Sequence, residues 1–254
     1  MKYVPVKEIN LEEEARTIKN EERLYRQVCF LTKPIANQVL KPLILNRKNL
    51  VGRNNTVIYA PNHRRTVDSI MLFNNIPDEI HFVALKRFFT GEDSIFNNNK
   101  NKLLRDFTAW LFNGIGLIPV VRPQDKEHYP NESNKYQLLI LKRYLELGKS
   151  VGIYPEGTTN KTLETELLDI DTTAFSLAKK MDGYVQPISI VYRPKDNPCK
   201  YKGIVNIRPA FKVENDIKEG AEQWKRSVLE GIEENNAIFD AAALKQKVKI
   251  MKRR

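Results

Sequence analysis

The chain has few of the residues and segments from which disulfide scaffolds, metal centres and membrane spans are built. Its two cysteines, Cys29 and Cys199, stand far apart without metal-ligand spacing, which argues against a disulfide framework or a zinc site. No window approaches the roughly 20 apolar residues that a spanning helix requires, because two lysines and two prolines interrupt the best candidate, residues 28–45. The first ten residues lack the apolar core of a signal peptide. We therefore expect an intracellular protein, soluble or attached to a membrane surface.

The chain also has fewer acidic residues than basic ones. The chain has 31 Asp and Glu against 42 Lys and Arg, a net charge of +11, which favours anionic partners such as phosphates, an acidic carrier protein or an anionic membrane. From Ala243 onward the sequence ALKQKVKIMKRR has six basic residues and no acid. This tail is either a solvated, frayed helix end or a membrane contact. Nucleic acid is not expected as a partner, because the basic residues form a tail rather than a face interleaved with aromatics.

The middle of the chain alternates short β-rich runs with helical stretches, and no repeat or low-complexity linker divides it. The predicted strands are 56–61, 80–85, 116–122, 150–155, 185–192 and 204–211, and the predicted helices lie near 67–75, 101–113, 132–147 and 172–181. This order predicts an α/β fold with a mostly parallel central sheet flanked by helices. We expect a single domain over 1–254, with an N-terminal helical segment (1–50), an α/β core (51–215) and C-terminal helices with the basic tail (216–254).

Residues 10–50 are predicted to be helical, with an amphipathic pattern. Apolar residues follow helical spacing, while Pro34 and Pro42 are expected to bend or break the segment. The apolar positions are Leu24, Val28, Leu31, Ile35 and Val39. Two interpretations stay open: a helix packed on the core, or an interfacial helix in a membrane surface. In the second, the residues near the headgroups are Arg23, Arg26, Lys33 and Lys41.

The stretch NHRRTVD (Asn62–Asp68) is the first candidate for chemistry. It places His63 and Asp68 five positions apart, directly after an apolar run. A histidine oriented by a carboxylate is a standard device for taking a proton from a hydroxyl near neutral pH. His81 and His128 have no aspartate at this spacing, and we expect both to be structural.

A second stretch, YPEGTTN (Tyr154–Asn160), also follows an apolar run. Taken alone it is a turn in which Gly157 supplies an unusual backbone angle and Glu156 is solvated. In a site, Glu156 accepts hydrogen bonds from substrate hydroxyls, and Gly157 and Thr158 hold an oxygen or a phosphate.

A third stretch, GIGLIPVVR, ends at Arg122. Alone it is a buried strand with a surface arginine, but beside the other two stretches Arg122 becomes a candidate phosphate clamp. Ligands of open α/β sheets bind at the carboxyl ends of the strands. We therefore expect the three stretches to meet at one edge of the sheet.

In this order the blocks resemble the glycerolipid acyltransferase family that includes 1-acyl-sn-glycerol-3-phosphate acyltransferases. The family pattern N-H-x-x-x-x-D, G-x-I-P-V-x-R, F-P-E-G-T-R and V-x-P-I is represented by NHRRTVD, GLIPVVR, YPEGTTN and VQPIS (Val185–Ser189). FVALKRFF resembles the lysine-bearing strand of the family, which places Lys86 near the site. The resemblance implies transfer of an acyl group from an acyl thioester to the free hydroxyl of a lysophospholipid. The expected reaction converts 1-acyl-glycerol-3-phosphate into phosphatidic acid.

The resemblance also implies roles for individual residues. His63 is the general base and Asp68 its orienting partner, while Arg122 binds the acceptor phosphate. The other predicted substrate-binding residues are Asn62, Lys86, Glu156, Gly157 and Thr158. Neither a cofactor, a metal nor a covalent acyl-enzyme is needed, because a deprotonated alcohol can attack a thioester directly.

The partners that follow are a lysophospholipid acceptor, acyl carrier protein (ACP) or coenzyme A carrying the acyl group, and an anionic membrane surface. The expected location is the cytoplasmic face of the membrane, with peripheral or monotopic attachment.

Two positions depart from the family pattern. Thr159 stands where the family has an arginine, and Asp171 stands about where it often has a lysine. Both changes weaken the binding of an acidic acceptor, unless Lys161, Arg64 or Arg65 compensates. Two alternatives therefore stay open: an acyltransferase with a different acceptor, or a catalytically weak relative that binds lipid or an acidic protein.

Overall fold

The computed structural model describes residues 11–52, 54–92, 101–122, 125–130, 134–161 and 166–251. The strands are β1 (Pro42–Leu45), β2 (Val57–Pro61), β3 (Ile80–Leu85), β4 (Ile118–Val120), β5 (Ser150–Gly152), β6 (Tyr184–Tyr192), β7 (Gly203–Ile207) and β8 (Phe211–Lys212). The helices are α1 (Leu11–Leu40), the 3₁₀ turn η1 (Arg47–Asn49), α2 (Asp68–Asn75), α3 (Lys86–Phe89), α4 (Lys102–Gly114), α5 (Lys135–Glu146), α6 (Thr173–Lys180) and α7 (Ile217–Met251).

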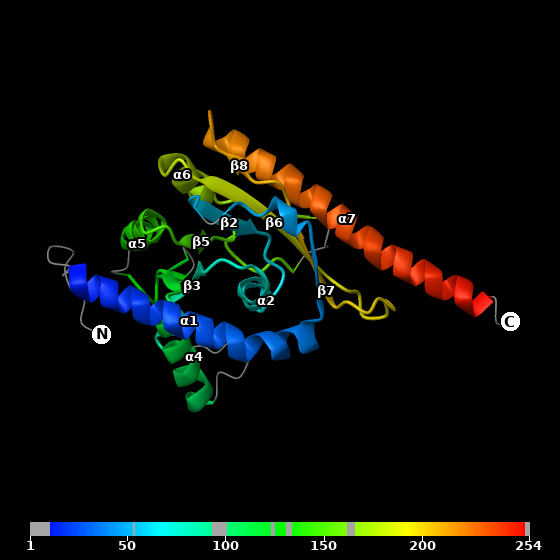
Figure 1. Ribbon diagram of the computed structural model, residues 1–254, viewed down its shortest axis with the longest axis horizontal. Coiled ribbons are helices and arrows are strands. Elements are labelled where there is room, and N and C mark those ends of the chain that lie inside the picture. Colours follow the sequence, from blue (N-terminus) through cyan, green and yellow to red (C-terminus); the bar gives the residue numbers. More distant parts are fainter. Residues whose placement is uncertain are drawn as a thin grey trace.

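One mostly parallel sheet forms the centre of the fold (Figure 1). Its strand order is β1-β7-β6-β2-β5-β3-β4, and β8 pairs with β6. Strands β6, β2, β5, β3 and β4 are parallel neighbours, whereas β7 and β8 run antiparallel to β6. The predicted α/β fold with a mostly parallel sheet is confirmed.

The sheet is buried on both faces, which explains why its strands are almost continuously apolar. Alternate residues of β2 point to opposite faces: Val57 and Tyr59 join one core cluster, and Ile58 and Ala60 join the other. Helices α1 and α2 cover the first cluster, and α5, α6 and α7 cover the second (Figure 1). Strand β2 is thus held between the two clusters, and the loop that contains His63 begins directly after its last residue, Pro61.

The elements predicted from the core of the sequence are present. Each of the six predicted strands overlaps an observed strand. Strands β4 and β5 are shorter than expected, and the predicted strand 204–211 is divided into β7 and the start of β8. Helices α2, α4, α5 and α6 lie where helices were predicted, although the first residues predicted for α5, 132 and 133, lie outside the described residues.

The N-terminal segment differs from the prediction at its end. The prediction of helix is wrong for residues 42–45, which form β1 and pair in parallel with β7. Helix α1 continues through Pro34, so this proline does not break it. Pro42 opens β1 at the edge of the sheet, where a missing backbone N–H is tolerated. Residues 1–10 lie outside the described part of the chain.

Helix α1 divides its apolar residues between the core and the surface. Leu24 and Val28 pack on the core cluster that also contains the buried Tyr25. Leu31 and Val39, on the same predicted stripe, are 65% and 55% exposed. One side of the helix therefore packs on the core, as the first interpretation predicts, and contact of the outward-facing apolar residues with a membrane surface stays a prediction.

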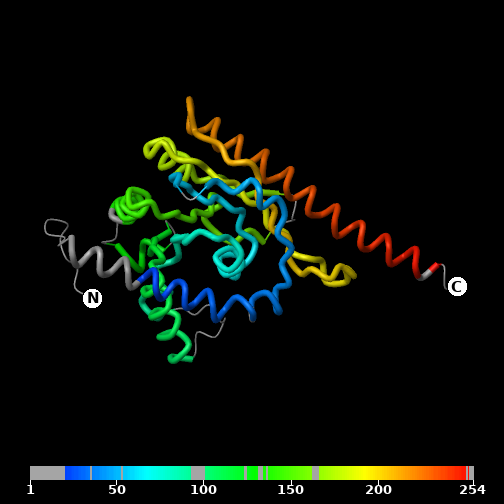
Figure 2. Tube along the Cα trace, viewed as in Figure 1, coloured from blue at the N-terminus to red at the C-terminus, as the bar shows by residue number. Residues whose placement is uncertain are grey.

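Helix α7 is one continuous helix rather than the several expected after residue 216. It lies along β6 and β7, where the fully buried Trp224 and Phe239 enter the core. Gly231 permits the close approach, because a Cβ at this position would lie 2.4 Å from Ser189 Oγ. The C-terminal end of this helix extends past the body of the protein (Figure 2). Within the described residues, no helix combines the length and apolarity needed to cross a bilayer.

Candidate active site

His63 and Asp68 form a hydrogen-bonded pair at the carboxyl end of β2. The strand ends at Pro61, and α2 begins at Asp68, so the two residues face each other across the loop between them. His63 Nδ1 lies 3.0 Å from Asp68 Oδ2. The loop gives the pair a geometry that a continuous helix with this spacing would not allow. The predicted meeting of these side chains is therefore observed.

Asp68 is fully buried and accepts hydrogen bonds from several directions. The backbone N–H groups of Arg64 and Arg65 donate to Oδ2 at 2.6 and 2.8 Å. The Tyr192 hydroxyl, from the end of β6, donates to Oδ1 at 2.6 Å. Burial, followed by the nearby Asp68 charge, raises the pKa of Tyr192, so this hydroxyl keeps its proton and remains a donor. These donors hold the carboxylate in the position from which it orients His63.

The imidazole of His63 is contacted on one face of its ring as well as at Nδ1. The ring of Tyr154 stacks on it with centroids 4.0 Å apart. Tyr154 is fixed in turn by a 2.7 Å hydrogen bond between its hydroxyl and Ser69 Oγ on α2. The second ring nitrogen, Nε2, lies 3.3 Å from Thr159 Oγ1. The His63 side chain is 17% exposed, so solvent-borne molecules can reach it.

Glu156 ties the YPEGTTN stretch to the NHRRTVD stretch. Its carboxylate is buried and accepts from His63 N at 2.8 Å, Asn160 Nδ2 at 2.7 Å and Leu168 N at 3.1 Å. Three of the roughly four acceptor positions of a carboxylate are thus occupied by the protein. The solvated Glu156 of the simple turn is not observed. Its role towards a substrate hydroxyl stays a prediction, while its structural contacts place His63 beside Thr159.

Asn62 does not face the site, in contrast to its predicted place among the substrate-binding residues. Its side chain is fully buried. The amide donates to Ile190 O at 3.1 Å and accepts from Ile190 N at 2.6 Å, which joins the end of β2 to β6. A buried polar side chain is stable only when bonded in this way. Asn62 therefore positions its neighbour His63 from within the core.

Arg122 reaches the same edge of the sheet from the end of β4. Its guanidinium pairs with Asp125 through Nε at 2.9 Å and Nη2 at 3.3 Å, and Nη1 donates to Thr158 Oγ1 at 3.4 Å. The hydrogen bond from Arg122 lowers the pKa of Asp125. Gly157 adopts φ 62°, the unusual angle expected of it, and is exposed. Arg122, Gly157 and Thr158 are thus brought together, and a phosphate at Arg122 would share the guanidinium with Asp125.

Lys86 begins α3 at the end of β3, and its Nζ lies 5.3 Å from the centre of the Tyr129 ring. Asp171 stands close to the YPEGTTN turn, because its backbone N–H donates to Pro155 O at 2.7 Å. Its carboxylate accepts from Thr173 N at 2.7 Å at the start of α6. Asp171, which stands about where the family lysine was expected, therefore forms an Asx turn just before α6.

A family model described as Acyltransferase matches residues 42–191, more than half of the chain. The chain belongs to the acyltransferase family. Its fold is similar to that of a 1-acyl-sn-glycerophosphate (LPA) acyltransferase, PlsC, from Thermotoga maritima, with a TM-score of 0.58 and 15% sequence identity. The similarity covers 87% of this chain and 86% of that chain. At this identity the likeness concerns the fold, and no curated protein sequence matches the chain.

Three residues of this acyltransferase site carried no distinct signal in the sequence. Tyr192 ends a strand and Tyr154 precedes the E-G-T turn, and either could be an ordinary core aromatic. Thr159 was noted for the arginine that it replaces, not for its contact with His63. The order of the strands in the sheet could have indicated Tyr192. Strand β6 lies beside β2 and runs parallel to it, so the end of β6 must lie near Asp68.

The other two histidines of the acyltransferase lie outside this group. His81 is buried at the start of β3, where Nδ1 meets Gly116 O at 2.9 Å and Nε2 lies 3.2 Å from Glu79. It therefore has a carboxylate neighbour that the spacing did not indicate, yet it stands at the opposite end of its strand from the site. His128 is exposed. Among the described residues, no group of three His, Cys, Asp or Glu side chains could hold a metal ion.

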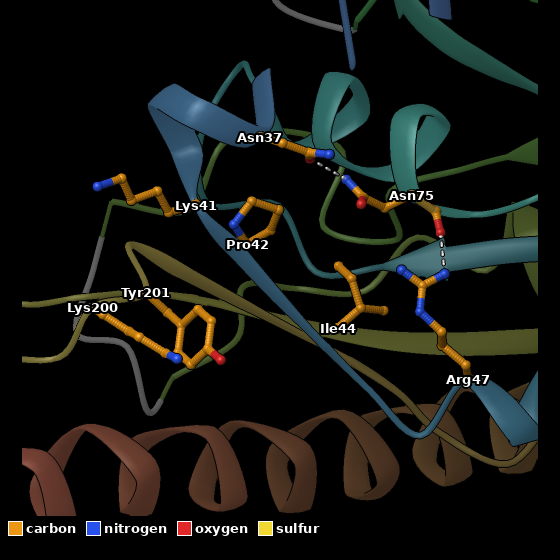
Figure 3. Close-up of a pocket in the computed structure, with 8 residues that line it drawn as sticks. All are labelled: Asn37, Lys41, Pro42, Ile44, Arg47, Asn75, Lys200 and Tyr201. Atoms are coloured by element: carbon orange, nitrogen blue, oxygen red, sulfur yellow. Dashed lines mark hydrogen bonds between the residues drawn. The ribbon is translucent and has the colours of Figure 1, made fainter. Parts of the chain in front are cut away.

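A basic groove lies beside the edge strand β1 (Figure 3). It encloses about 530 Å³ and is lined by three cationic side chains, Lys41, Arg47 and Lys200. Arg47 Nη1 donates to Asn75 O at 2.7 Å, which holds one wall of the groove to the end of α2. The remaining lining residues are Asn37, Pro42, Ile44, Asn75 and Tyr201. Its charge suits an anionic ligand, and Lys41 is one of the cations expected near headgroups.

Proposed function

We propose that this acyltransferase moves an acyl group from an acyl thioester to the free hydroxyl of a lysophospholipid, with His63 as the general base. The observation that carries the proposal is the His63–Asp68 pair at the carboxyl edge of the sheet, with Nδ1 and Oδ2 3.0 Å apart. Asp68 fixes Nδ1 as the protonated nitrogen and leaves Nε2 to accept a proton. His63 then takes the proton of the acceptor hydroxyl as its oxygen attacks the acyl carbonyl.

The acceptor that we propose to test first is 1-acyl-glycerol-3-phosphate, which would give phosphatidic acid. The similarity in fold to the PlsC enzyme motivates this choice, and the guanidinium of Arg122 at the edge of the site offers a phosphate partner. Thr158 and Gly157 lie beside it on the turn that faces the same edge. The donor is acyl-ACP or acyl-coenzyme A, and the positive charge of the chain suits either. The chemistry proposed for the chain's own residues needs no cofactor.

The test is an acceptor panel with purified protein. Acyl-coenzyme A and acyl-ACP are each incubated with phosphorylated, zwitterionic and neutral lysolipids, and both free thiol and acylated product are measured. We expect product with at least one lysophospholipid, and a loss on the order of 10²–10⁴-fold in kcat for His63→Ala. His128→Ala, which removes an exposed histidine, is the matched control and should retain full activity.

Two results would count against the proposal. Thiol release that is unchanged in His63→Ala excludes this histidine as the base. Binding to lipid without product from any acceptor identifies the chain instead as a catalytically weak relative that acts as a lipid-binding module.

We further propose that the enzyme works at an anionic membrane surface, on the cytoplasmic face. Two helices in contact with each other, α1 and α4, expose large apolar side chains: Phe30 is 80% exposed and Leu103 is 78% exposed. The end of α7 adds a stripe of apolar residues among lysines. Apolar side chains beside basic ones fit the boundary between acyl chains and anionic headgroups. Such attachment would bring the site to a lipid acceptor without a spanning helix.

A further inference from the structure

The basic groove beside β1 carries positive charge at both of its ends. Lys41 and Lys200 lie towards one end and Arg47 towards the other, with β1 between them (Figure 3). Four residues in a strand span about 13 Å. A single phosphate is too small to contact both ends at once, whereas a longer ligand with two anionic groups can do so.

The three cations of the groove are not neutralised by the protein. The residues that line the groove include no acid. Within the described parts of the chain, no carboxylate lies at ion-pair distance from Lys41, Arg47 or Lys200. Lys200 contacts only the ring of Tyr201 in its own segment, with Nζ 4.9 Å from the ring centre. The groove is therefore a local excess of positive charge that favours anionic ligands.

Lys41 occupies its place in an unusual backbone conformation. It follows the last residue of α1 with φ 40°, in the left-handed region that glycine usually takes at the end of a helix. Its N–H donates to Asn37 O at 3.0 Å, and its carbonyl accepts from Lys202 N at 3.2 Å. The second bond holds the connection that carries Lys200 beside Lys41. Such backbone outliers are found preferentially where ligands bind, and this one brings a cation to the groove.

Arg47 is held at the other end by contacts with α2 and α1. Its Nη1 donates to Asn75 O at 2.7 Å, and Asn75 Nδ2 donates to Asn37 Oδ1 at 3.2 Å. One N–H of the guanidinium thus fixes its position. The remaining N–H groups can pair with two oxygens of a phosphate, a geometry to which guanidinium is well suited.

The groove borders an exposed apolar part of α1. Val39 stands two residues before Lys41, and both Val39 and Leu31 are exposed on this helix. Apolar side chains next to a phosphate site fit a lipid, because acyl chains can cover the apolar residues while the phosphates meet the cations. With about 530 Å³, the groove is also within the usual size range of ligand pockets.

We propose that this groove is a second binding site, for a membrane phospholipid that carries two phosphate groups. One phosphate pairs with Lys41 and Lys200, and the other pairs with Arg47. Because both phosphates belong to one molecule, binding of the first raises the local concentration of the second. Coenzyme A also carries phosphates at separate positions, and the experiment distinguishes this soluble source from the lipid. The inference concerns binding alone and does not depend on the proposed acyl transfer.

The test is flotation of the purified full-length chain with two kinds of phosphatidylcholine vesicle. One contains diphosphatidylglycerol, which has two phosphates per molecule. The other contains twice the molar amount of phosphatidylglycerol, so that both vesicles carry the same number of anionic phosphates. General attraction to a charged surface is then equal. We expect binding to the first kind to be at least about tenfold tighter.

Single substitutions assign this preference to the groove. Arg47→Gln and Lys200→Gln should each remove it, because only one phosphate then keeps its full set of partners. Lys48→Gln and Lys202→Gln are the matched controls, since they remove the same charge from exposed neighbours outside the lining, and both should keep the preference. Lys41→Gly should weaken the preference with the fold intact, because glycine readily adopts φ 40°.

Three results would overturn the inference. The first is equal binding of the wild type to both vesicles, and the second is a preference that survives in Arg47→Gln and in Lys200→Gln. The third is calorimetric binding of coenzyme A that is lost in these two variants, which assigns the groove to a soluble ligand. No donor or acceptor of acyl groups is present during flotation. A negative result there leaves the proposed acyl transfer intact, and a negative acceptor panel leaves the lipid site intact.

Discussion

Asp68 receives hydrogen bonds from residues that are close in sequence and from one that is distant. His63, Arg64 and Arg65 belong to its own loop, whereas Tyr192 lies 124 positions away and arrives through the pairing of β2 with β6. A buried carboxylate needs such donors, because removing a charge from water is costly unless hydrogen bonds replace the lost hydration. The tyrosine thus contributes to the position of Asp68, which is itself bonded to His63.

Tyr192→Phe should lower both stability and turnover. The substitution removes the 2.6 Å hydrogen bond to Asp68 Oδ1 and leaves a buried charged oxygen with fewer donors. Hydrogen bonds to charged groups contribute about 1.5–3 kcal/mol, so we expect a loss of this size in the free energy of unfolding. The rate constant kcat should fall while KM changes little, because the base loses orientation but the substrate loses no contact. Urea unfolding and steady-state kinetics measure the two effects.

Tyr144→Phe provides the matched control at the residue scale. The Tyr144 hydroxyl also donates to a carboxylate, Glu21 Oε2 at 2.7 Å, but it joins α5 to α1 away from the site. Its removal should lower stability and leave kcat unchanged. A similar drop in kcat for both variants would show that loss of stability alone explains the effect at Tyr192.

The sequence identified residues whose spacing is local and missed those whose partners are distant. His63 and Asp68 were predictable because a short loop joins them, and Gly157 because a turn needs its backbone angle. Asn62 was misplaced because the pattern groups it with His63, while the fold turns its side chain towards β6. Thr159 owes its place beside His63 to the contacts of Glu156 and Asn160, which no spacing rule contains.

At the scale of elements, α7 supports strand β2, which leads into the loop of His63. Trp224 is fully buried on this helix, and its Nε1 donates to Ala60 O at 2.7 Å. Ala60 lies in β2, three positions before His63. The last helix of the chain therefore contacts the backbone that leads directly into the site.

Trp224→Phe should destabilise the protein by about 1–3 kcal/mol. Phenylalanine leaves a small cavity and removes the only donor on the indole, so the Ala60 carbonyl loses this buried partner. Thermal or urea unfolding measures the loss. Trp110→Phe is the control, since Trp110 is 56% exposed on α4 and its substitution should change stability by less than about 0.5 kcal/mol. Equal effects at the two positions would contradict the role given to Trp224.

Elements with a clear pattern of apolar residues were predictable, whereas the edge strand β1 was not. The strands β2, β3 and β6 are long apolar runs between turn residues, which is the pattern of a buried parallel strand. Strand β1 has four residues, PLIL; Pro42 was expected to bend or break the helical segment, but a proline alone does not indicate that a strand follows. Its strand geometry comes from pairing with β7, far along the chain, and a helix pattern cannot show that contact.

At the scale of the whole molecule, the end of α7 is a separate amphipathic surface. Leu244, Val248 and Met251 are 63%, 37% and 67% exposed. At about 100° per residue these three fall within one narrow stripe, roughly opposite the side on which Trp224 and Phe239 enter the core. The lysines interspersed with them are Lys245, Lys247 and Lys249. An apolar stripe that faces away from the body, flanked by cations, favours the membrane interpretation of the tail over the frayed end.

Replacing the stripe should weaken membrane binding without affecting the fold. We expect the triple variant Leu244→Asn, Val248→Asn and Met251→Gln to bind anionic vesicles at least tenfold more weakly, as measured by co-flotation. Each large apolar side chain contributes about 1.5–3 kcal/mol when fully buried, and partial insertion of three exceeds the roughly 1.4 kcal/mol of a tenfold change. Stability should stay near that of the wild type, because the stripe faces away from the sheet.

The lysines of the same segment are expected to contribute an electrostatic attraction to anionic lipid. Binding to vesicles with anionic lipid should fall as salt is raised, whereas binding to purely zwitterionic vesicles should be weak at every salt concentration. The triple substitution Leu103→Asn, Phe107→Asn and Trp110→Asn on α4 is the comparison, since those residues are also exposed apolar side chains. If the α7 variant floats with anionic vesicles as well as the wild type while the α4 variant does not, the membrane contact belongs to α4, and the tail of α7 is a solvated helix end.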